Sequence, residues 1–196
     1  MLRLPVKLAT ACRPSAPASF DSLTSRPALR YFYDCEFIED GVTIELVSIG
    51  VVAEDGREFY AVSTEFRAER AIDWVRQNVL NQLPSPADPA WRSRARIRED
   101  LYAFLRAGSG GIELWAWYAG YDHVALAQLW GDMRALPRDI PRFTRELRQR
   151  WEDRGKPPLP EQAAGLHDAL GDARHNLARW QAMHGNSNPA LLDKNG

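Results

Sequence analysis

The chain has 196 residues, with 25 Lys or Arg against 26 Asp or Glu and a formal net charge of -1. A chain of this length buries roughly 70% of its unfolded surface, so one domain with a sizeable core is expected without disulfide staples. The balanced charge excludes a protein that coats nucleic acid by bulk positive charge. No uninterrupted apolar stretch reaches about 18 residues, so we expect no membrane segment.

The first 30 residues differ from the rest, with five Lys or Arg, one acidic residue and many Ser, Pro and Ala. Three interpretations stay open: a disordered basic arm, a stretch read from a start codon placed too far upstream, or an acid-poor targeting segment. We expect residues 1–30 to be a disordered or non-native arm, residues 31–184 one domain and residues 185–196 a flexible tail. The two cysteines, Cys12 and Cys35, suit a reducing cytoplasm.

Three strands are predicted after the arm. Residues 31–38, 44–53 and 58–63 are rich in aromatic and β-branched residues, and Asp-Gly pairs at 40–41 and 55–56 separate them. Asp-Gly between such runs is typical of tight hairpin turns. The pattern therefore indicates an antiparallel meander.

Helical periodicity dominates the remainder of the chain. Apolar spacing predicts helices over 69–83, 90–106, 121–130, 143–153 and 168–183, and the apolar run IELWAWY predicts a buried strand over 112–118. A Pro-rich loop at 156–165 precedes the last helix. This order of elements indicates an α/β domain in which helices pack on a mixed sheet.

Asp34 and Glu36 lie two residues apart in the first predicted strand. Alternate strand residues point to the same face, so both carboxylates are expected on one side, about 6.6 Å apart along the strand. A hard divalent cation such as Mg²⁺ or Mn²⁺ would join them. The alternative is an edge strand with a solvated acidic face. On the opposite face Cys35 is expected to be a buried structural thiol.

Asp122 follows directly on the predicted strand over 112–118. In open α/β sheets ligands bind beyond the carboxyl ends of the strands, and a carboxylate in the first turn after a strand lies there. The alternative interpretation is a plain helix cap.

His167 and Asp172 lie at the beginning of the last predicted helix. Five helical steps turn by about 140°, so the two would not share one stripe if both were helical. His167 is therefore expected on the loop, where a mobile imidazole suits a general base. A helix N-terminus with acidic residues in its first turn explains the segment equally well.

Together the three motifs resemble a family. A strand D-x-E, a strand-to-helix Asp and H-x-A-x-x-D on the last helix, in that order, are similar to the DEDDh 3′-5′ exonucleases of the ribonuclease H-like fold. The segments YFYDCEFIEDG, WAWYAGYDHVALAQLWGDM and LHDALGDARHNLARW resemble the actinobacterial branch of polyadenylate-specific 3′-exoribonuclease AS, mycobacterial type. The resemblance spans roughly residues 31–184.

The resemblance implies a mixed five-stranded sheet, an antiparallel meander plus parallel strands, flanked by helices. It also implies a metal-dependent 3′ to 5′ exoribonuclease that releases nucleoside 5′-monophosphates from RNA with a free 3′ end, with a homodimer possible. Two divalent ions, Mg²⁺ or Mn²⁺, would be held by Asp34, Glu36, Asp122 and Asp172. His167 would be the general base of the two-metal mechanism.

Substrate contacts are predicted from position alone. Tyr121 offers a ring for stacking, and Asn176 and Arg179 lie one and two turns beyond Asp172. Arginine-rich helix faces are phosphate-tracking candidates, although such faces are usually only solvated: Arg92, Arg94, Arg96 and Arg98 on one, and Arg142, Arg145, Arg148, Arg150 and Arg154 on the other.

Three other functions stay open at this point. The same fold supports a 3′-5′ exodeoxyribonuclease, because four carboxylates do not read the 2′-OH. A non-catalytic nucleic-acid-binding protein would explain the fold without the carboxylates. An HD-type phosphohydrolase would need more metal-binding histidines than the four that the chain contains.

The net charge conceals a division along the chain. Residues 31–58 contain eight acidic residues and one Arg, whereas residues 138–156 contain seven Lys or Arg and four acidic residues. Residues 91–106 contain five Arg and two acidic residues. We therefore expect an acidic centre flanked by basic helices.

Overall fold

The computed structural model describes residues 27–162 and 166–185. Most of the predicted arm, residues 1–26, and the predicted tail from residue 186 lie outside the described residues. The first strand begins at Leu29, two residues before the predicted start of the domain. Among the described residues, none forms a helix that is both long and apolar enough to cross a membrane.

The centre of the domain is a six-stranded mixed sheet in the order β4-β3-β2-β1-β5-β6. Strands β1 (Leu29–Glu39), β2 (Ile44–Ala53) and β3 (Glu58–Ser63) form the predicted antiparallel meander. Strand β5 (Ile112–Ala116) runs parallel to β1, β6 (Arg145–Glu146) parallel to β5, and β4 (Trp91–Arg92) parallel to β3. The predicted arrangement of an antiparallel meander plus parallel strands is thus confirmed.

The expected count of five strands was wrong by one. Strands β4 and β6 contain two residues each, too few to produce a period-two pattern, and both lie at the ends of the sheet. Residues 90–92 and 143–146 were accordingly predicted as parts of helices. In the structure Ser93 ends the extended segment, because its side chain accepts a hydrogen bond from the Arg96 N–H and caps the following helix.

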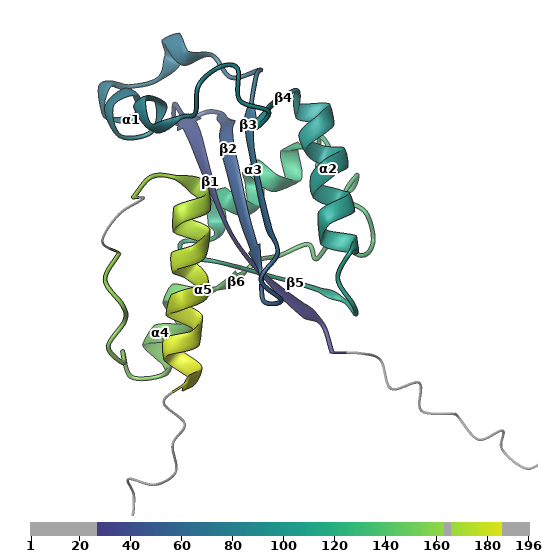
Figure 1. Cartoon of the computed structure of the whole chain (residues 1–196), viewed down its shortest axis with the longest axis vertical. Helices are drawn as coiled ribbons and strands as arrows, with labels where there is room; N and C mark the ends of the chain where they lie inside the picture. Colours follow the sequence, from purple (N-terminus) through teal and green to yellow (C-terminus); the bar gives the residue numbers. More distant parts are fainter. Residues whose placement is uncertain (1–26, 163–165, 186–196) are drawn as a thin grey trace, which may run out of the picture.

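Helices cover both faces of the sheet (Figure 1). Helix α5 (Ala169–Gly185) packs across β1 and β2, and α4 (Leu147–Asp153) lies beside it. On the opposite face are α2 (Arg94–Arg106) and α3 (Gly120–Gln128). Three layers result, with the meander in the middle.

The predicted helix over residues 69–83 was wrong as one continuous element. It is divided into a 3-10 turn η1 (Ala68–Arg70), the short helix α1 (Asp73–Asn78) and a second turn η2 (Leu80–Gln82). Residues 71 and 72 are extended, so the helical hydrogen bonds are interrupted between η1 and α1. This break allows Ala71 and Val79 to pack into a small cluster with Ile38 and Val47 at the end of the meander.

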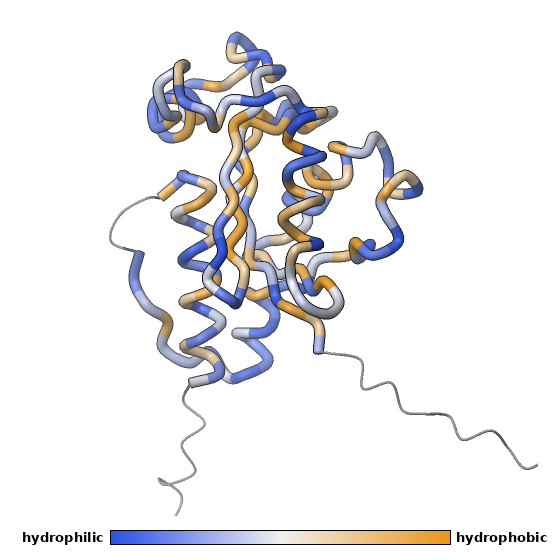
Figure 2. The backbone as a smooth tube through the Cα atoms, turned by 45° about the vertical axis from the view of Figure 1, so that its right-hand side comes forward, coloured by the Kyte–Doolittle hydropathy of each residue, from blue (hydrophilic) through white to orange (hydrophobic). Residues whose placement is uncertain are grey.

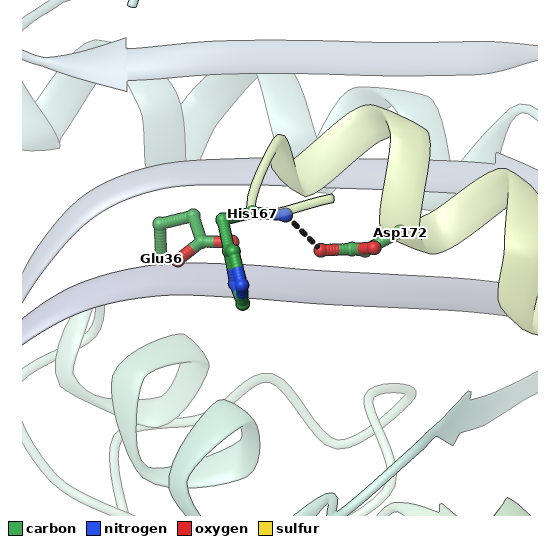
Figure 3. Close-up of side chains that lie close together, drawn as sticks. All are labelled: Glu36, His167 and Asp172. Carbon is green, nitrogen blue, oxygen red and sulfur yellow. Dashed lines mark hydrogen bonds between the residues drawn. The ribbon is translucent and has the colours of Figure 1, made fainter. Parts of the chain in front are cut away.

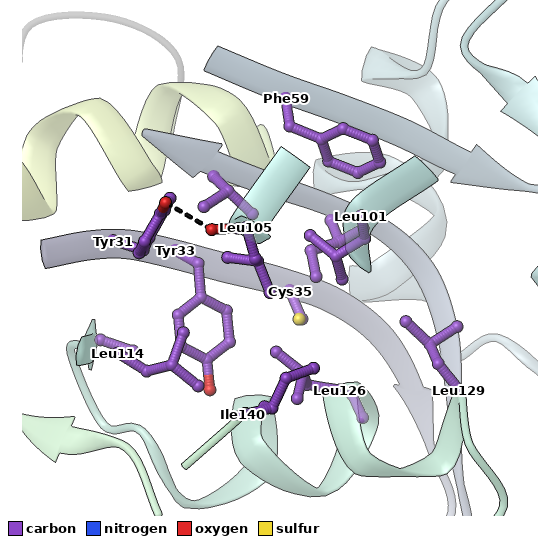
Figure 4. Close-up of a cluster of buried hydrophobic side chains, with 14 of the residues drawn as sticks. Tyr31, Tyr33, Cys35, Phe59, Leu101, Leu105, Leu114, Leu126, Leu129 and Ile140 are labelled. Atoms are coloured by element: carbon purple, nitrogen blue, oxygen red, sulfur yellow. Dashed lines mark hydrogen bonds between the residues drawn. The ribbon is translucent and has the colours of Figure 1, made fainter. Parts of the chain in front are cut away.

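Strand β1 is buried on both faces, and its successive side chains point alternately to one face of the sheet and to the other. Tyr31, Tyr33 and Cys35 point into the larger cluster with α2 and α3, where the Tyr31 hydroxyl donates to the Leu105 carbonyl at 2.6 Å (Figure 4). Phe32 points to the other face, among residues of α4 and α5. Figure 2 shows the apolar strands inside and hydrophilic segments around them. The buried thiol of Cys35 was predicted correctly.

Gly50 permits the closest approach between α5 and the sheet. A Cβ at this position of β2 would lie 2.3 Å from the Ala169 carbonyl oxygen and 2.4 Å from Leu170 Cα, both backbone atoms that have no rotamer to change. Gly50 pairs with Asp34 across the sheet. The absence of one methyl group therefore sets the distance between the beginning of α5 and the acidic part of β1.

Gly50→Ala is expected to lower the free energy of unfolding by about 2 to 3 kcal/mol, because the added methyl group forces two backbones apart. Urea denaturation measures this. The control is Gly185→Ala at the end of α5, where a Cβ has no neighbour within 4 Å. Equal stabilities of the two variants would show that α5 does not depend on this contact.

Candidate active site

Asp34 and Glu36 lie on the α5 side of β1, on the same face as Phe32. Asp34 is opposite Gly50, and the pairing register with β2 shifts between Glu36 and Phe37. Such a bulge bends a strand and changes the direction of its side chains. Both carboxylates are therefore held by the sheet next to this register shift, and both line one cleft, as the sequence predicts for a shared face.

Asp122 reaches the same place from α3. Strands β1 and β5 are paired only as far as Phe32 and Trp115, so beyond that point the β1 backbone has no strand on this side. The Asp122 carboxylate occupies the opening and accepts a hydrogen bond from the Cys35 N–H at 2.9 Å. Its side chain is 5% exposed. Asp122 is thus fixed next to Asp34 by the divergence of two parallel strands.

The loop before α3 is held by one further carboxylate. Glu146 accepts hydrogen bonds from the backbone N–H groups of Tyr118 and Ala119, at 2.9 and 2.8 Å, and from that of Arg148. Tyr118 is left-handed, with φ of 60°, which a non-glycine residue adopts at a cost of roughly 1 kcal/mol or more. Glu146 offsets this cost and fixes where α3, and with it Asp122, begins.

His167 and Asp172 come from the start of α5. His167 precedes the helix in a left-handed conformation, with φ of 60°, and its backbone N–H donates to Asp172 Oδ2 at 2.9 Å. The other carboxylate oxygen, Oδ1, accepts from Gln162 Nε2 at 2.6 Å. As predicted, His167 lies outside the helix and Asp172 within its first turn.

One cleft of about 440 Å³ collects all five predicted residues: Asp34, Glu36, Asp122, His167 and Asp172. Ligand atoms of Glu36, His167 and Asp172 lie within 4.8 Å of one another, close enough for one metal ion (Figure 3). The five side chains that line the cleft come from β1, from α3, from the residues just before α5 and from the first turn of α5. Residues that are far apart in the sequence therefore meet at one end of the sheet.

The carboxylates oppose one another's ionisation. Burial raises the pKa of Asp34 well above its usual range, and the charges of Asp122 and Glu36 raise it further, whereas Arg179 lowers it. Burial, then Asp172 and Asp122, raise the pKa of Glu36 to about 8. The pKa of Asp122 is raised to about 7, first by burial. Among the ion pairs of residues 27–162 and 166–185, none includes any of the four carboxylates.

Of the three predicted substrate residues, two face the cleft. Tyr121 is 52% exposed and stacks on Phe37 with ring centroids 5.7 Å apart, and Arg179 lines the cleft with its guanidinium 4.3 Å from the Trp117 ring centre. Asn176 is buried instead. Its Nδ2 donates to the Tyr33 carbonyl and its Oδ1 accepts from Arg179 Nη1 at 3.0 Å. Asn176 therefore holds Arg179 in place from within the protein.

Sequence reasoning missed three residues around His167. The Trp74 ring of α1 meets the imidazole edge to face at 4.7 Å, Gln82 Nε2 donates to the Leu166 carbonyl at 2.9 Å, and Gln162 supports Asp172. Residues 71–82 thus pack on the loop that presents the histidine. No local pattern indicates this, because the contacts depend on how the divided helix folds over the end of the sheet.

Comparisons with known proteins show the family of the chain. A family model described as the 3′-5′ exoribonuclease Rv2179c-like domain matches residues 29–184. The chain belongs to the Rv2179c-like 3′-5′ exoribonuclease family. Two curated relatives from Mycobacterium tuberculosis, 3′-5′ exoribonuclease Rv2179c of strain H37Rv and 3′-5′ exoribonuclease MT2234.1 of strain CDC 1551, are each 66% identical over 156 residues, which are 79% of this chain and 93% of theirs.

Membership of the Rv2179c-like family confirms the predicted class, a hydrolase of phosphodiester bonds that acts on RNA from the 3′ end. Among solved structures, the Mg²⁺- and Mn²⁺-bound form of Pop2p from S. pombe matches with a TM-score of 0.48 and 11% identity, over 84% of this chain and 86% of that one.

The raised carboxyl pKa values predict how stability depends on pH in chelator-treated protein. Because the pKa of Glu36 (about 8) and of Asp122 (about 7) exceed their unfolded values near 4, the folded state binds more protons between these limits. Their contribution to stability is fully present below about pH 4 and is lost as pH rises through 7 and 8. The unfolding midpoint temperature is expected to fall from about pH 6 to about pH 9.

The matched variant is Glu36→Gln, which is neutral at every pH and similar in shape. Its midpoint is expected to fall less over the same range, since one of the contributing titrations has been removed. An identical fall in the wild type and in Glu36→Gln would place the pH dependence elsewhere in the molecule.

Proposed function

We propose that this chain removes nucleotides one at a time from a free 3′ end of RNA and releases nucleoside 5′-monophosphates. Asp34, Glu36, Asp122 and Asp172 would hold two divalent cations, Mg²⁺ or Mn²⁺, and His167 would be the general base. One observation carries the proposal: three distant segments bring four carboxylates and one imidazole into a single cleft. We place the activity in the cytoplasm, where the buried Cys35 thiol stays reduced.

The donor set suits hard divalent cations. Oxygen ligands are those that Mg²⁺ and Mn²⁺ prefer, and four carboxylates offer more negative charge than the half-buried Arg179 can balance. Burial and the neighbouring carboxylates raise the pKa of Asp34 and Glu36, so a bound cation would favour their ionised forms, which supports the proposal. When bound, divalent ions lower the pKa of the attacking water and stabilise the leaving 3′ oxygen.

The residues of the chain itself orient the reaction. His167 precedes α5, its backbone N–H donates to Asp172, and the residue lines the cleft. In the proposed mechanism the imidazole takes the proton of the attacking water. Tyr121 offers a ring to the terminal base, and Arg179 a guanidinium to the phosphate.

Asp34→Asn and Asp172→Asn are each expected to abolish release of mononucleotides from a 3′-tailed RNA, because each removes a metal-binding charge with little change in volume. His167→Ala is expected to lower kcat by about 10² to 10⁴. Product chromatography in Mg²⁺ or Mn²⁺ measures both, with Glu39→Gln, an exposed carboxylate on the same strand, as the control. Full activity of the aspartate variants would refute the proposed site.

The requirement for a free 3′ end and the preference for RNA are tested with three matched oligonucleotides of one sequence: linear RNA, circular RNA and linear DNA. Linear RNA is expected to yield nucleoside 5′-monophosphates, and circular RNA none, since it offers no 3′ end. DNA is expected to be cleaved more slowly. Cleavage of the circle would show an endonuclease, and equal rates on RNA and DNA would show that the cleft does not read the 2′-OH.

A homodimer is part of the same proposal. Ile72, Trp74 and Leu166 are 61%, 51% and 54% exposed, and Trp74 and Leu166 lie at the loop that carries His167. Apolar side chains that remain exposed in one chain are commonly covered by a partner. Sedimentation velocity of the wild type and of a Trp74→Ser variant tests this, and a monomeric wild type would contradict it.

A further inference from the structure

We propose that the RNA strand upstream of the 3′-terminal nucleotide leaves the cleft along a ladder of alternating cationic and aromatic side chains that crosses α4 and ends just beyond it, at Lys156. The ladder consists of Arg179, Trp117, Tyr118, Arg148, Trp151 and Lys156. Its ligand is single-stranded RNA, through both phosphates and bases. The inference rests on the proposed function, because it takes the 3′ end to lie at the carboxylates.

The ladder begins inside the cleft. Arg179, Trp117 and Tyr118 all line the cleft that holds the carboxylates. The Arg179 guanidinium lies over the Trp117 ring at 4.3 Å and is held from behind by Asn176, so it is pre-organised to meet an anion. A strand whose 3′ end is at Asp34 would place its next phosphates near this guanidinium.

Arg148 is the centre of the ladder. Its guanidinium lies 4.8 Å from the Trp151 ring centre, 5.8 Å from that of Trp117 and 6.0 Å from that of Tyr118, and its Nη1 donates to the Tyr118 hydroxyl at 3.2 Å. Trp117 contacts both Tyr118 and Trp151 edge to face or tilted, near 6 Å. Cation and rings therefore form a continuous surface from the cleft to α4.

Tyr118 is the most accessible ring of the ladder. It is 64% exposed, although it makes cation-π and hydrogen-bond contacts that fix its orientation, and Glu146 fixes its left-handed backbone. An exposed ring that is held rigid loses little conformational entropy when a base stacks on it. This combination favours stacking, which needs a preformed platform.

Lys156 continues the ladder on the far side of Trp151, at 5.5 Å from its ring centre. Glu152 pairs with both cations, with Arg148 at 3.0 Å and with Lys156 at 3.6 Å. Exposed pairs of this kind contribute little to stability, so phosphate oxygens replace Glu152 at small cost. The negative charge of Glu152 then opposes RNA binding. Removal of this charge is therefore expected to strengthen RNA binding, whereas removal of Arg148 or Lys156 weakens it.

The other arginine-rich helix lacks this organisation. On α2, Arg96 pairs with Asp100 at 2.8 Å with the same four-residue spacing as Arg148 and Glu152, and Arg98 pairs with Glu99. Neither lines the cleft. Alternating rings and cations that track a backbone are the usual means of binding single strands without reading sequence. The geometry therefore points to α4 rather than α2.

The test compares kcat/KM for an oligoadenylate of roughly 12 nucleotides with that for the dinucleotide, and takes their ratio. Arg148→Gln and Lys156→Gln are each expected to lower this ratio about three- to tenfold, and to reduce the slope of log affinity against log salt by about 0.7, the value for one lost phosphate contact on a single strand. Glu152→Gln is expected to raise the ratio. Arg96→Gln and Asp100→Asn are the matched controls, with no change expected.

Affinity is measured in parallel by fluorescence anisotropy of 5′-labelled RNA on the inactive Asp172→Asn background, so the ladder is tested even without turnover. Unchanged ratios and affinities in Arg148→Gln and Lys156→Gln, or weaker binding in Glu152→Gln, would overturn the ladder. A wild type that binds RNA with these dependences but releases no mononucleotide would overturn the proposed function and leave the ladder standing. Thermal unfolding shows that each variant is folded.

Discussion

Electrostatic repulsion among four carboxylates in one half-buried cleft is the constraint on which the rest of the structure depends. Burial raises the pKa of Asp34, Glu36 and Asp122, the charges of neighbouring carboxylates in the cleft raise these pKa values further, and Arg179 lowers that of Asp34. Carboxylates this close together would move apart unless rigid elements of the fold held them in place. The cleft therefore costs stability that the core must supply.

The core supplies this stability because β1 packs on both of its faces. One face of the strand fills the α2 and α3 cluster with Tyr31 and Tyr33, and the other packs Phe32 against α4 and α5. This packing is interrupted at two places, and the two interruptions make space for the acidic cleft. The divergence of β1 from β5 admits Asp122, and Gly50 admits the α5 backbone. Both interruptions lie within two residues of Asp34 along the sheet.

The sequence predicts those features that depend on local periodicity. Alternation places Asp34 and Glu36 on one face, and helical geometry separates His167 from Asp172, as found. Asp122 follows from its position after a buried strand. The resemblance joined these into one site, because no single motif distinguishes a metal ligand from a cap or a solvated carboxylate.

Features that depend on packing between distant segments could not be predicted. The helix expected over 69–83 breaks because Ala71 and Val79 find partners on β1 and β2. Strands β4 and β6 exist only because longer strands beside them offer free backbone groups. The Trp74 contact with His167 depends on the first of these rearrangements.

The division of charge along the chain acquires a physical meaning from the same packing. Two residues of the acidic segment, Asp34 and Glu36, line the cleft. The basic segment after residue 138 includes α4 and its surroundings, where aromatic rings hold the cations. Arginines that stack on rings keep their charge outward and lose little entropy when a phosphate arrives. A polyanion is repelled by the carboxylates and attracted by α4. In the proposed mechanism, divalent cations bound in the cleft would reverse the first interaction, so metal binding would decide whether a strand held on α4 can bring its 3′ end to Asp34.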